Sequence, residues 1–135
     1  MSTLAAPTEL LAQEDLNYLQ QKGYQYAVTQ TDGLIYVVIR QYKLPPAYTP
    51  SQTDMLLRLP PNFPMARPDM FWTFPHVRRA ANGSYPQACE TFDVNYEGQQ
   101  WQRWSRHFDA KLWRPGVDNL KTYLGTIKHE LEKGI

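Results

Sequence analysis

Three side chains in the second half of the sequence carry groups that can act as nucleophiles or bases: Cys89, Ser105 and His107. Cys89 is the only thiol, which excludes an internal disulfide and a zinc site built from cysteines. Ser105 lies two residues from His107, and a histidine close to a serine can activate its hydroxyl. No third member of a triad is evident, so this common pairing does not by itself establish a serine nucleophile. The three histidines lack the spacing of metal ligands, and we expect neither a metal nor a cofactor.

Arginines and tryptophans surround these residues in the sequence. We expect the tryptophans to be core residues or a groove wall rather than a ligand cage: Trp101, Trp104 and Trp113. The densest basic set near them consists of Arg78, Arg79, Arg103, Arg106 and Arg114. These arginines form either a solvated rim or a docking surface for an acidic tail or a partner. If they bind, we expect the contacts to come from Trp104, Arg103 and Arg106.

The totals are those of one globular domain. The chain has 135 residues with a net charge of +1, which gives no reason to expect a nucleic acid or an anionic membrane as partner. It contains no apolar run near 18 residues and no basic-then-apolar leader, so a soluble cytoplasmic protein is expected. We expect residues 1–8 to be a flexible terminus and residues 9–135 to form the single domain.

Periodicity predicts a helix, four strands, a long loop and a second helix. Apolar residues spaced along a helical face predict helices over residues 8–22 and 115–133. Alternating or β-branched runs predict strands over residues 24–29, 34–42, 53–59 and 69–74. Residues 77–100 are polar and loop-like, with an optional hairpin pairing residues 90–94 and 101–104. This order predicts an α+β fold with a four-stranded antiparallel meander sheet covered by the C-terminal helix.

The segment Leu59–His76 joins the last two of these strands and is unusually rich in proline. It contains five prolines, which fix much of its backbone and bias the preceding residues away from helix. Within it, Phe63-Pro64 is followed by three residues and Pro68, and the strand that comes next ends at Pro75-His76. Downstream, Trp113-Arg114-Pro115 precedes the second helix.

These motifs, in this order, resemble the ubiquitin-conjugating enzyme (UBC) fold over roughly residues 12–133. The family has an aromatic-Pro, three residues and a Pro, then a strand that ends before a His-Pro-Asn, and later a Trp-x-Pro before a helix. Here Pro75 and His76 stand in reversed order. The sequence between Trp101 and Asp118 is most similar to a bacterial branch, prokaryotic family E, found in operons with an activating enzyme and a JAB-type peptidase. Members of that branch lack the usual catalytic cysteine and retain a histidine.

The resemblance also implies where the chemistry should lie. The family's cysteine stands about eight residues before the Trp of Trp-x-Pro, and that position here is Ser105, with His107 close by. Cys89 lies 24 residues before Trp113, so only a loop that folds back would bring it there. Val77 follows His76 where the family has its oxyanion-stabilising Asn, and Asn82 is the substitute that the loop offers. The motif residues Pro64, Pro68, His76, Trp113 and Pro115 are expected to be structural.

Two interpretations stay open for each reactive residue. Cys89 is either the nucleophile, as the only residue able to form a thioester, or an inert, small packed side chain. His107 is either a general base or acyl-carrying nucleophile, or a residue that hydrogen-bonds the long loop onto the sheet.

Three hypotheses about function follow from the resemblance and its gaps. In the first, the protein accepts or positions a ubiquitin-like protein delivered by an activating enzyme, as a transferase with an altered active site. In the second, it is a noncatalytic UBC- or RWD-like adaptor that binds the modifier or the activating enzyme. In the third, it is an unrelated α+β interaction domain. The branch further implies a JAB-type peptidase in the same pathway and a role in antiphage defence.

Overall fold

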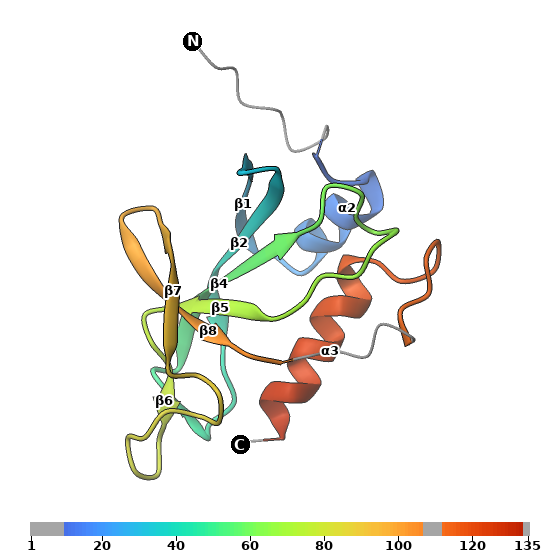
Figure 1. The fold of residues 1–135 in the computed structure, drawn as a ribbon. Coiled ribbons are helices and arrows are strands. Elements are labelled where there is room, and N and C mark those ends of the chain that lie inside the picture. The colour runs from blue at the N-terminus through green and yellow to red at the C-terminus, as the bar shows by residue number, and fades with distance from the viewer. Residues whose placement is uncertain (1–9, 107–111, 134–135) are drawn as a thin grey trace.

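We describe the fold from a computed structural model, which describes residues 10–106 and 112–133 (Figure 1). The expected flexible terminus, residues 1–8, and His107 lie outside these ranges. In chain order the elements are α2 (Gln13–Gln21), β1 (Gln25–Thr31), β2 (Leu34–Lys43), β3 (Tyr48–Thr49), β4 (Gln52–Leu59), β5 (Phe71–Phe74), β6 (Arg78–Arg79), β7 (Thr91–Tyr96), β8 (Gln99–Trp104) and α3 (Leu120–Glu132). No helix within the described ranges is long and apolar enough to cross a membrane.

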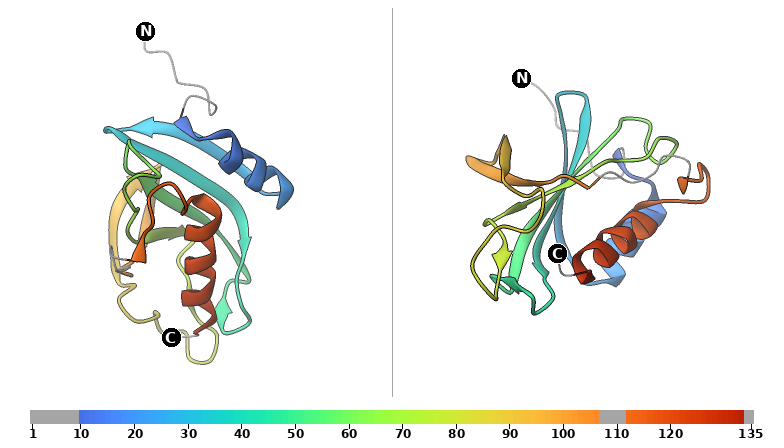
Figure 2. Two further views of the ribbon diagram at one scale, coloured as in Figure 1. Left: turned by 90° about the vertical axis from the view of Figure 1, so that its right-hand side faces the viewer. Right: turned by 60° about the horizontal axis from the view of Figure 1, so that its bottom comes forward.

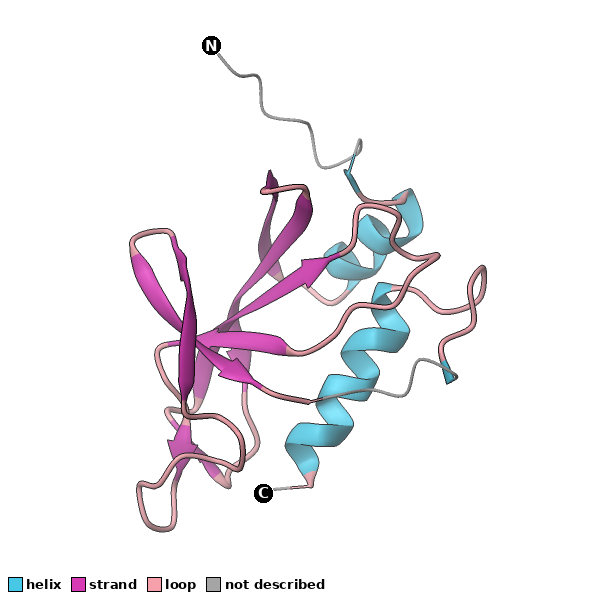
Figure 3. Cartoon of the chain, in the orientation of Figure 1, coloured by secondary structure: helices cyan, strands magenta, loops and turns pink. Residues whose placement is uncertain are grey.

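The main sheet has six strands in the order β1-β2-β4-β5-β8-β7, and all neighbouring pairs are antiparallel (Figure 3). The first four strands are the predicted meander. The optional hairpin also forms, as β7 and β8, and β8 pairs with β5 so that the hairpin extends the sheet. A small ribbon of β3 and β6 lies apart from this sheet. The predicted α+β class is therefore confirmed, with an antiparallel sheet that lies between the two helices in sequence; the sheet has six strands rather than the predicted four, because the hairpin joins it.

The two helices pack on the same face of the sheet, which we call the inner face (Figure 2). Buried side chains of β2, β4 and α3 meet there, among them Val37, Ile39, Leu57, Leu124 and Ile127. The apolar positions of α3 recur at three- and four-residue steps, so burying this stripe drives the helix onto the sheet. The predicted cover of the sheet by the C-terminal helix is thus observed, and α2 adds to it.

The helix boundaries follow local capping chemistry. Gly23 adopts φ 72° after α2, and the amides of Gly23 and Tyr24 donate to the carbonyls of Gln20 and Leu19 in a Schellman arrangement. The second helix was predicted from residue 115 but begins at Leu120. Gly116 adopts φ 83°, which is not a helical conformation, so the predicted first turn does not form. Asn119 caps the observed helix by accepting a hydrogen bond from the Thr122 amide.

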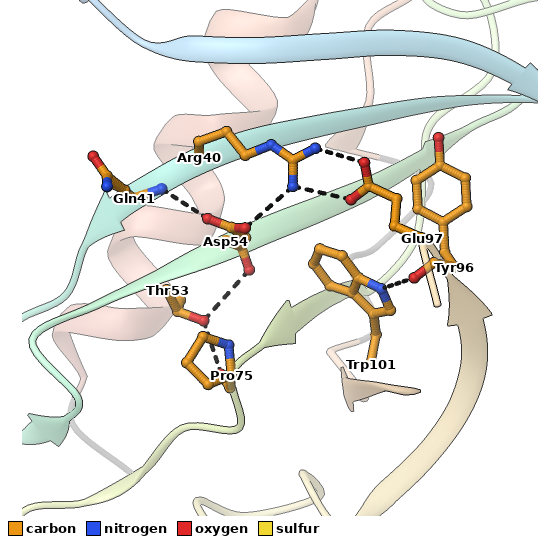
Figure 4. Close-up of polar contacts among 8 residues, drawn as sticks. All are labelled: Arg40, Gln41, Thr53, Asp54, Pro75, Tyr96, Glu97 and Trp101. Carbon is orange, nitrogen blue, oxygen red and sulfur yellow. Dashed lines mark hydrogen bonds and ion pairs between the residues drawn. The ribbon is translucent and has the colours of Figure 1, made fainter. Parts of the chain in front are cut away.

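The opposite, outer face of the sheet is covered by the β7–β8 hairpin. A second buried cluster forms there from side chains of β2, β4, β5 and the hairpin: Tyr36, Val38, Leu56, Trp72, Val94 and Trp101. At the hairpin turn, Glu97 pairs with Arg40, which also contacts Asp54 (Figure 4). Five consecutive residues of β2, from 35 to 39, are buried because both faces of this strand are covered.

The crossover between β4 and β5 is joined to the segment before α3. The Phe63-Pro64 bond is cis, and the indole N–H of Trp113 donates to the Pro64 carbonyl at 2.8 Å. The Trp113 ring also lies 6.0 Å from the Phe63 ring and 6.5 Å from the Tyr123 ring. The two motifs that resemble the UBC family therefore contact each other and fix the position of α3 beside the crossover.

Candidate active site

Strand β8 leads directly into Ser105 and Arg106, the first two residues of the site that the resemblance implies. The half-buried Ser105 hydroxyl accepts a hydrogen bond from Arg103 Nε at 3.1 Å. The Ser105 amide donates to the Ala88 carbonyl at 3.2 Å. Ser105 is therefore held from two sides, and His107 lies outside the described residues.

The contact between Ser105 and Ala88 shows that the loop carrying Cys89 does fold back to the end of β8. Ala88 adopts φ 58°, a left-handed conformation that turns the chain sharply before Cys89. Arg106 donates from Nη1 to the Gln87 carbonyl at 2.7 Å, which adds a second link between the loop and the strand end. Sequence separation alone argued against this proximity, and the structure brings the two candidates together.

Cys89 itself is buried and has the properties of an inert thiol. Its side chain has no exposed surface, and its sulfur donates to the Gln87 carbonyl at 3.4 Å. Burial raises the pKa of the Cys89 thiol to about 12, and the nearby guanidinium of Arg106 offsets only part of this rise. At neutral pH the group is a thiol rather than a thiolate, so this conformation does not support nucleophilic attack.

Gln102 organises the loop, and sequence analysis did not single it out. It is completely buried, and its amide oxygen accepts from Thr73 Oγ1 at 2.9 Å and from the Val77 amide at 2.7 Å. Its amide nitrogen donates to the carbonyls of Val77 and Cys89 at 2.9 and 3.0 Å. One side chain therefore joins β5, the start of the long loop and the Cys89 segment. The alternation of β8, in which Gln102 shares the inner face with Trp104, was the available signal.

A small pocket of about 310 Å³ opens beside Ser105. Its lining comes from the fold-back loop, the end of β8 and the end of α3: Gln87, Ala88, Ser105, Arg106, Glu130 and Lys133. Glu130 contacts both cations, Lys133 at 2.7 Å and Arg106 at 3.9 Å. The pocket shares Glu130 and Lys133 with a groove of about 460 Å³ that is also lined by α3 residues and Trp113. The two hollows thus adjoin and connect Ser105 with the Trp-x-Pro segment.

The predicted binding residues lie at different distances from this pocket. Arg106 lines it, and its guanidinium lies 5.3 Å from the centre of the Trp104 ring. Trp104 is completely buried, stacks on Phe71 at 5.1 Å and donates to Thr73. It therefore supports Arg106 from beneath and does not form an exposed groove wall. Arg103 does not line the pocket, but bonds Ser105 and pairs with Asp93 at 2.8 Å.

The remaining arginines do not converge on Ser105. Arg78 donates to the Tyr85 hydroxyl at 2.8 Å, and Arg114 pairs with Asp118 at 3.1 Å. Arg79 lies close enough to Cys89 to lower the thiol pKa slightly against the effect of burial. The basic set of the sequence is thus distributed over several surfaces, and only Arg106 belongs to the pocket.

Asn82 and His76 occupy positions set by the long loop. Asn82 is exposed in the turn after β6, where its side-chain oxygen accepts from the Ser84 amide and hydroxyl at 3.0 and 2.7 Å. The half-buried His76 ring stacks on Phe92 at 4.4 Å, and its Nε2 lies 3.1 Å from the Gln100 carbonyl. His76 thereby links the end of β5 to the hairpin, whereas the interactions of Asn82 are within its own turn.

The described residues contain no group of three or more His, Cys, Asp or Glu side chains that could hold a metal ion. The groups available for chemistry at the pocket are a hydroxyl, a guanidinium, an ammonium and a carboxylate. Such a set suits the positioning of a peptide-like tail and acyl transfer to a side chain.

The order helix, sheet, helix, the proline crossover and its contact with Trp-x-Pro are consistent with a ubiquitin-conjugating-like (E2-like) fold. The family model described as prokaryotic E2 family E matches residues 11–134, and the chain belongs to this family. Searches of curated proteins and of solved structures returned no match.

Proposed function

We propose that this protein receives the C-terminal tail of a ubiquitin-like protein from an activating enzyme and positions it at Ser105. The carrying observation is the pocket at Ser105, which adjoins the groove along α3 through Glu130 and Lys133. An extended tail laid along α3 would reach the end of β8, where the resemblance implies the reacting group. Membership in the prokaryotic E2 family supports both partners in general terms.

In this proposal the acyl group goes to Ser105 or His107, and Cys89 stays protonated. The acceptor attacks the carbonyl carbon of the modifier's thioester, the carbon–sulfur bond breaks, and the thiol of the activating enzyme leaves with a proton. A serine acceptor gives an oxyester, and a histidine acceptor gives an acyl-imidazole. His107 as general base would take the serine proton in the first case. Arg106 lines the pocket, and Arg103 bonds the Ser105 hydroxyl; Arg106 would stabilise the developing oxyanion in place of Asn82, the substitute that the loop offers.

The test is an adduct assay with the cognate activating enzyme, the modifier and ATP, read by intact mass. We expect an adduct that survives Cys89→Ala and is lost in Ser105→Ala or His107→Ala. Hydroxylamine lability would separate an ester from an amide. An adduct lost only in Cys89→Ala would overturn the proposal in favour of the thiol, and no adduct in any variant would exclude the enzymatic function.

A noncatalytic adaptor is the second candidate, and the buried Cys89 thiol favours it. Under this hypothesis the protein binds the modifier or activating enzyme without forming a bond. His107→Ala separates the two: loss of conjugation with intact binding by calorimetry supports catalysis, whereas unchanged pathway activity supports the adaptor. Cys89→Ala is the control for each measurement, because neither hypothesis assigns the thiol a chemical role.

The wider pathway is also part of the proposal. We expect genes for an activating enzyme, a ubiquitin-like protein and a JAB-type peptidase close to this one, a cytoplasmic location, and a contribution to antiphage defence. Residues 9–135 would act as one domain. Deleting the gene in its natural host and measuring phage plating efficiency tests the last of these roles, and unchanged efficiency would contradict it.

A further inference from the structure

A third hollow lies where α2, β1, β2 and α3 meet, and it shares no lining residue with the Ser105 pocket or the adjoining groove. Its volume is about 530 Å³. Its lining comes from the turn between α2 and β1, the start of β1, the bulged end of β2 and one α3 side chain: Lys22, Gly23, Tyr24, Gln25, Arg40, Gln41, Tyr42, Lys43 and Lys128. The bulge exists because Gln41 adopts φ 51° with its amide bonded to Asp54, and it turns Tyr42 to the inner face. We call this hollow the lysine groove.

The lysine groove is strongly positive. Lys22, Lys43 and Lys128 are exposed, and none of them forms an ion pair with a residue of the described ranges. Its fourth cation, Arg40, is already paired with Glu97 and Asp54. No lining residue is acidic; besides Glu97 and Asp54, which pair with Arg40, Glu132 lies near enough to add to the raised pKa of Tyr42. Three ammonium groups therefore face a hollow without internal counter-charges.

Two tyrosines add neutral hydrogen-bond donors to this charge. The rings of Tyr24 and Tyr42 lie 6.1 Å apart, and neither hydroxyl has a hydrogen-bond partner among the described residues. Burial raises the pKa of both hydroxyls, to about 12 for Tyr42, so both remain protonated at neutral pH. Their rings also offer apolar surface between the ammonium groups.

The backbone at the groove is not arranged to hold a phosphate. The amides of Lys22, Gly23 and Tyr24 all donate to carbonyls of α2, at 3.0, 3.0 and 3.2 Å, so they form no anion-binding nest. The helix end at this point carries the negative pole of its dipole, which disfavours a compact anion placed against it. The positive groups are side chains spread over three elements, which suits several separate carboxylates better than one phosphate.

We propose that the lysine groove binds an acidic peptide segment of a partner protein. Carboxylates of the segment pair with Lys22, Lys43 and Lys128, and its backbone or an apolar side chain packs on Tyr24 and Tyr42. This surface is separate from the Ser105 pocket, so the inference holds whether or not the protein forms a covalent adduct.

The probe is a fluorescein-labelled octapeptide with four glutamates, compared with the same peptide carrying glutamines, in anisotropy titrations at low and moderate salt. We expect saturable binding of the glutamate peptide that weakens with salt. Removing one exposed lysine should weaken binding roughly twofold to threefold, and the triple variant Lys22→Ala, Lys43→Ala, Lys128→Ala roughly tenfold or more. Lys121→Ala, an exposed lysine elsewhere on α3, is the matched control for Lys128→Ala and should bind as the wild type does.

Three outcomes would overturn the proposal. These are equal binding of the glutamine peptide, a triple variant that binds as the wild type does, and the absence of saturable binding. Tighter binding of a single-stranded oligonucleotide that the triple variant loses would assign the groove to nucleic acid instead. Amide shifts of the glutamate complex by NMR add an independent readout: supporting shifts are confined to Gly23, Lys43 and their neighbours, and shifts only at Ser105 would contradict the assignment.

Discussion

The Cys89 thiol lies beneath the loop that turns at Ala88, with the Gln87 carbonyl as its hydrogen-bond acceptor. Two guanidinium groups act on it, from Arg106 and Arg79, and in an exposed site they would favour the thiolate. Burial dominates because a thiolate in this position would lose more hydration than the hydrogen bond from Arg106 and the two guanidinium charges replace. Burial therefore determines the reactivity of this cysteine more than the two nearby positive charges do.

The first prediction is that Cys89 reacts slowly in the folded protein. With the pKa raised from 9.0 to about 12, the folded state holds roughly a thousandfold less thiolate at pH 8 than the unfolded chain. A disulfide-exchange reagent should therefore modify the protein far faster in guanidinium chloride than in buffer. Since the pKa of Cys89 is higher in the folded state than in the unfolded chain, the protonated thiol favours folding. This contribution to the free energy of unfolding is fully present below pH 9 and is lost as the pH rises toward 12. Equal rates in buffer and denaturant would show that the thiol is exposed.

The second residue-scale prediction concerns Gln102. Gln102→Leu keeps the volume but leaves the Val77 amide and two loop carbonyls without partners, so we expect a loss of about 3 kcal/mol of unfolding free energy. Urea titration measures it. The matched control is Gln100→Ala, an exposed position of the same strand, which should change stability by less than about 0.5 kcal/mol.

The same Gln102→Leu variant should also make Cys89 more reactive, because Gln102 bonds the Cys89 carbonyl. This second readout separates a role in holding the loop from a general loss of stability. If the variant is destabilised but Cys89 reacts at the wild-type rate in buffer, Gln102 stabilises the sheet without positioning the loop.

At the level of elements, the β7–β8 hairpin is held on the outer face at its turn as well as along its length. Tyr96 bonds Thr29 at 2.6 Å and lies 4.8 Å from the Tyr36 ring. Arg40 makes a two-point contact with Glu97, at 2.9 and 2.6 Å (Figure 4). Because β8 ends at Ser105, contacts that fix the hairpin also fix the start of the candidate site.

The third prediction is a measurable coupling between Arg40 and Glu97. Both side chains are about one-third exposed, so solvent screens the pair, and its two-point geometry favours the upper part of the usual range. A double-mutant cycle of Arg40→Ala and Glu97→Ala should give a coupling of about 0.5–1 kcal/mol that falls in 1 M NaCl. A coupling near zero at low salt would mean that ring packing alone holds the turn.

The same hairpin shows why part of the sheet could be predicted from the sequence only as an option. In β7 only Val94 is buried, so this strand lacks the apolar alternation that identified β1, β2 and β4. Its conformation depends on pairing with β8 and on the ring contacts of Tyr96, which are tertiary interactions. The helix over residues 115–133 was predicted from its apolar stripe, yet its start was misplaced because Pro115 suited a first turn and the positive φ of Gly116 was not foreseen.

The candidate site was predictable only in part for the same reason. Counting from Trp113 identified Ser105, and the structure places Ser105 in a pocket. The proximity of Cys89 was not predictable, because it depends on four hydrogen bonds of one buried amide, at Gln102, and on a left-handed residue at Ala88. Spacing along the chain is enough to locate a family motif. The path of a loop that folds back depends instead on hydrogen bonds to residues far away in sequence, such as Gln102.

At the level of the whole molecule, the sheet is covered on both faces, by α2 and α3 on the inner face and by its own hairpin on the outer one. The central strands β2 and β4 therefore lie inside two hydrophobic clusters at once. The Ser105 pocket and the lysine groove both lie at margins of this body, where α3 meets the end of β8 or the end of β2. A rigid centre with polar margins suits a protein that positions partners on several surfaces.

This arrangement gives a final prediction for native-state hydrogen exchange. Amides in the middle of β2 and β4, at Val37–Ile39 and Met55–Leu57, should exchange only by global unfolding, because these residues have no exposed surface and pair within the sheet. Amides of the two-residue ribbon β3–β6 should exchange through local opening, with lower protection. When exchange is measured at increasing urea concentrations, the exchange free energy of the β2 and β4 amides should fall with the global unfolding free energy. The exchange free energy of the ribbon amides should not. Trp101→Ala removes part of the outer cluster and should lower protection in β2 and β4 as well as in the hairpin. Lower protection in the hairpin alone would contradict a core in which β2 and β4 depend on both clusters.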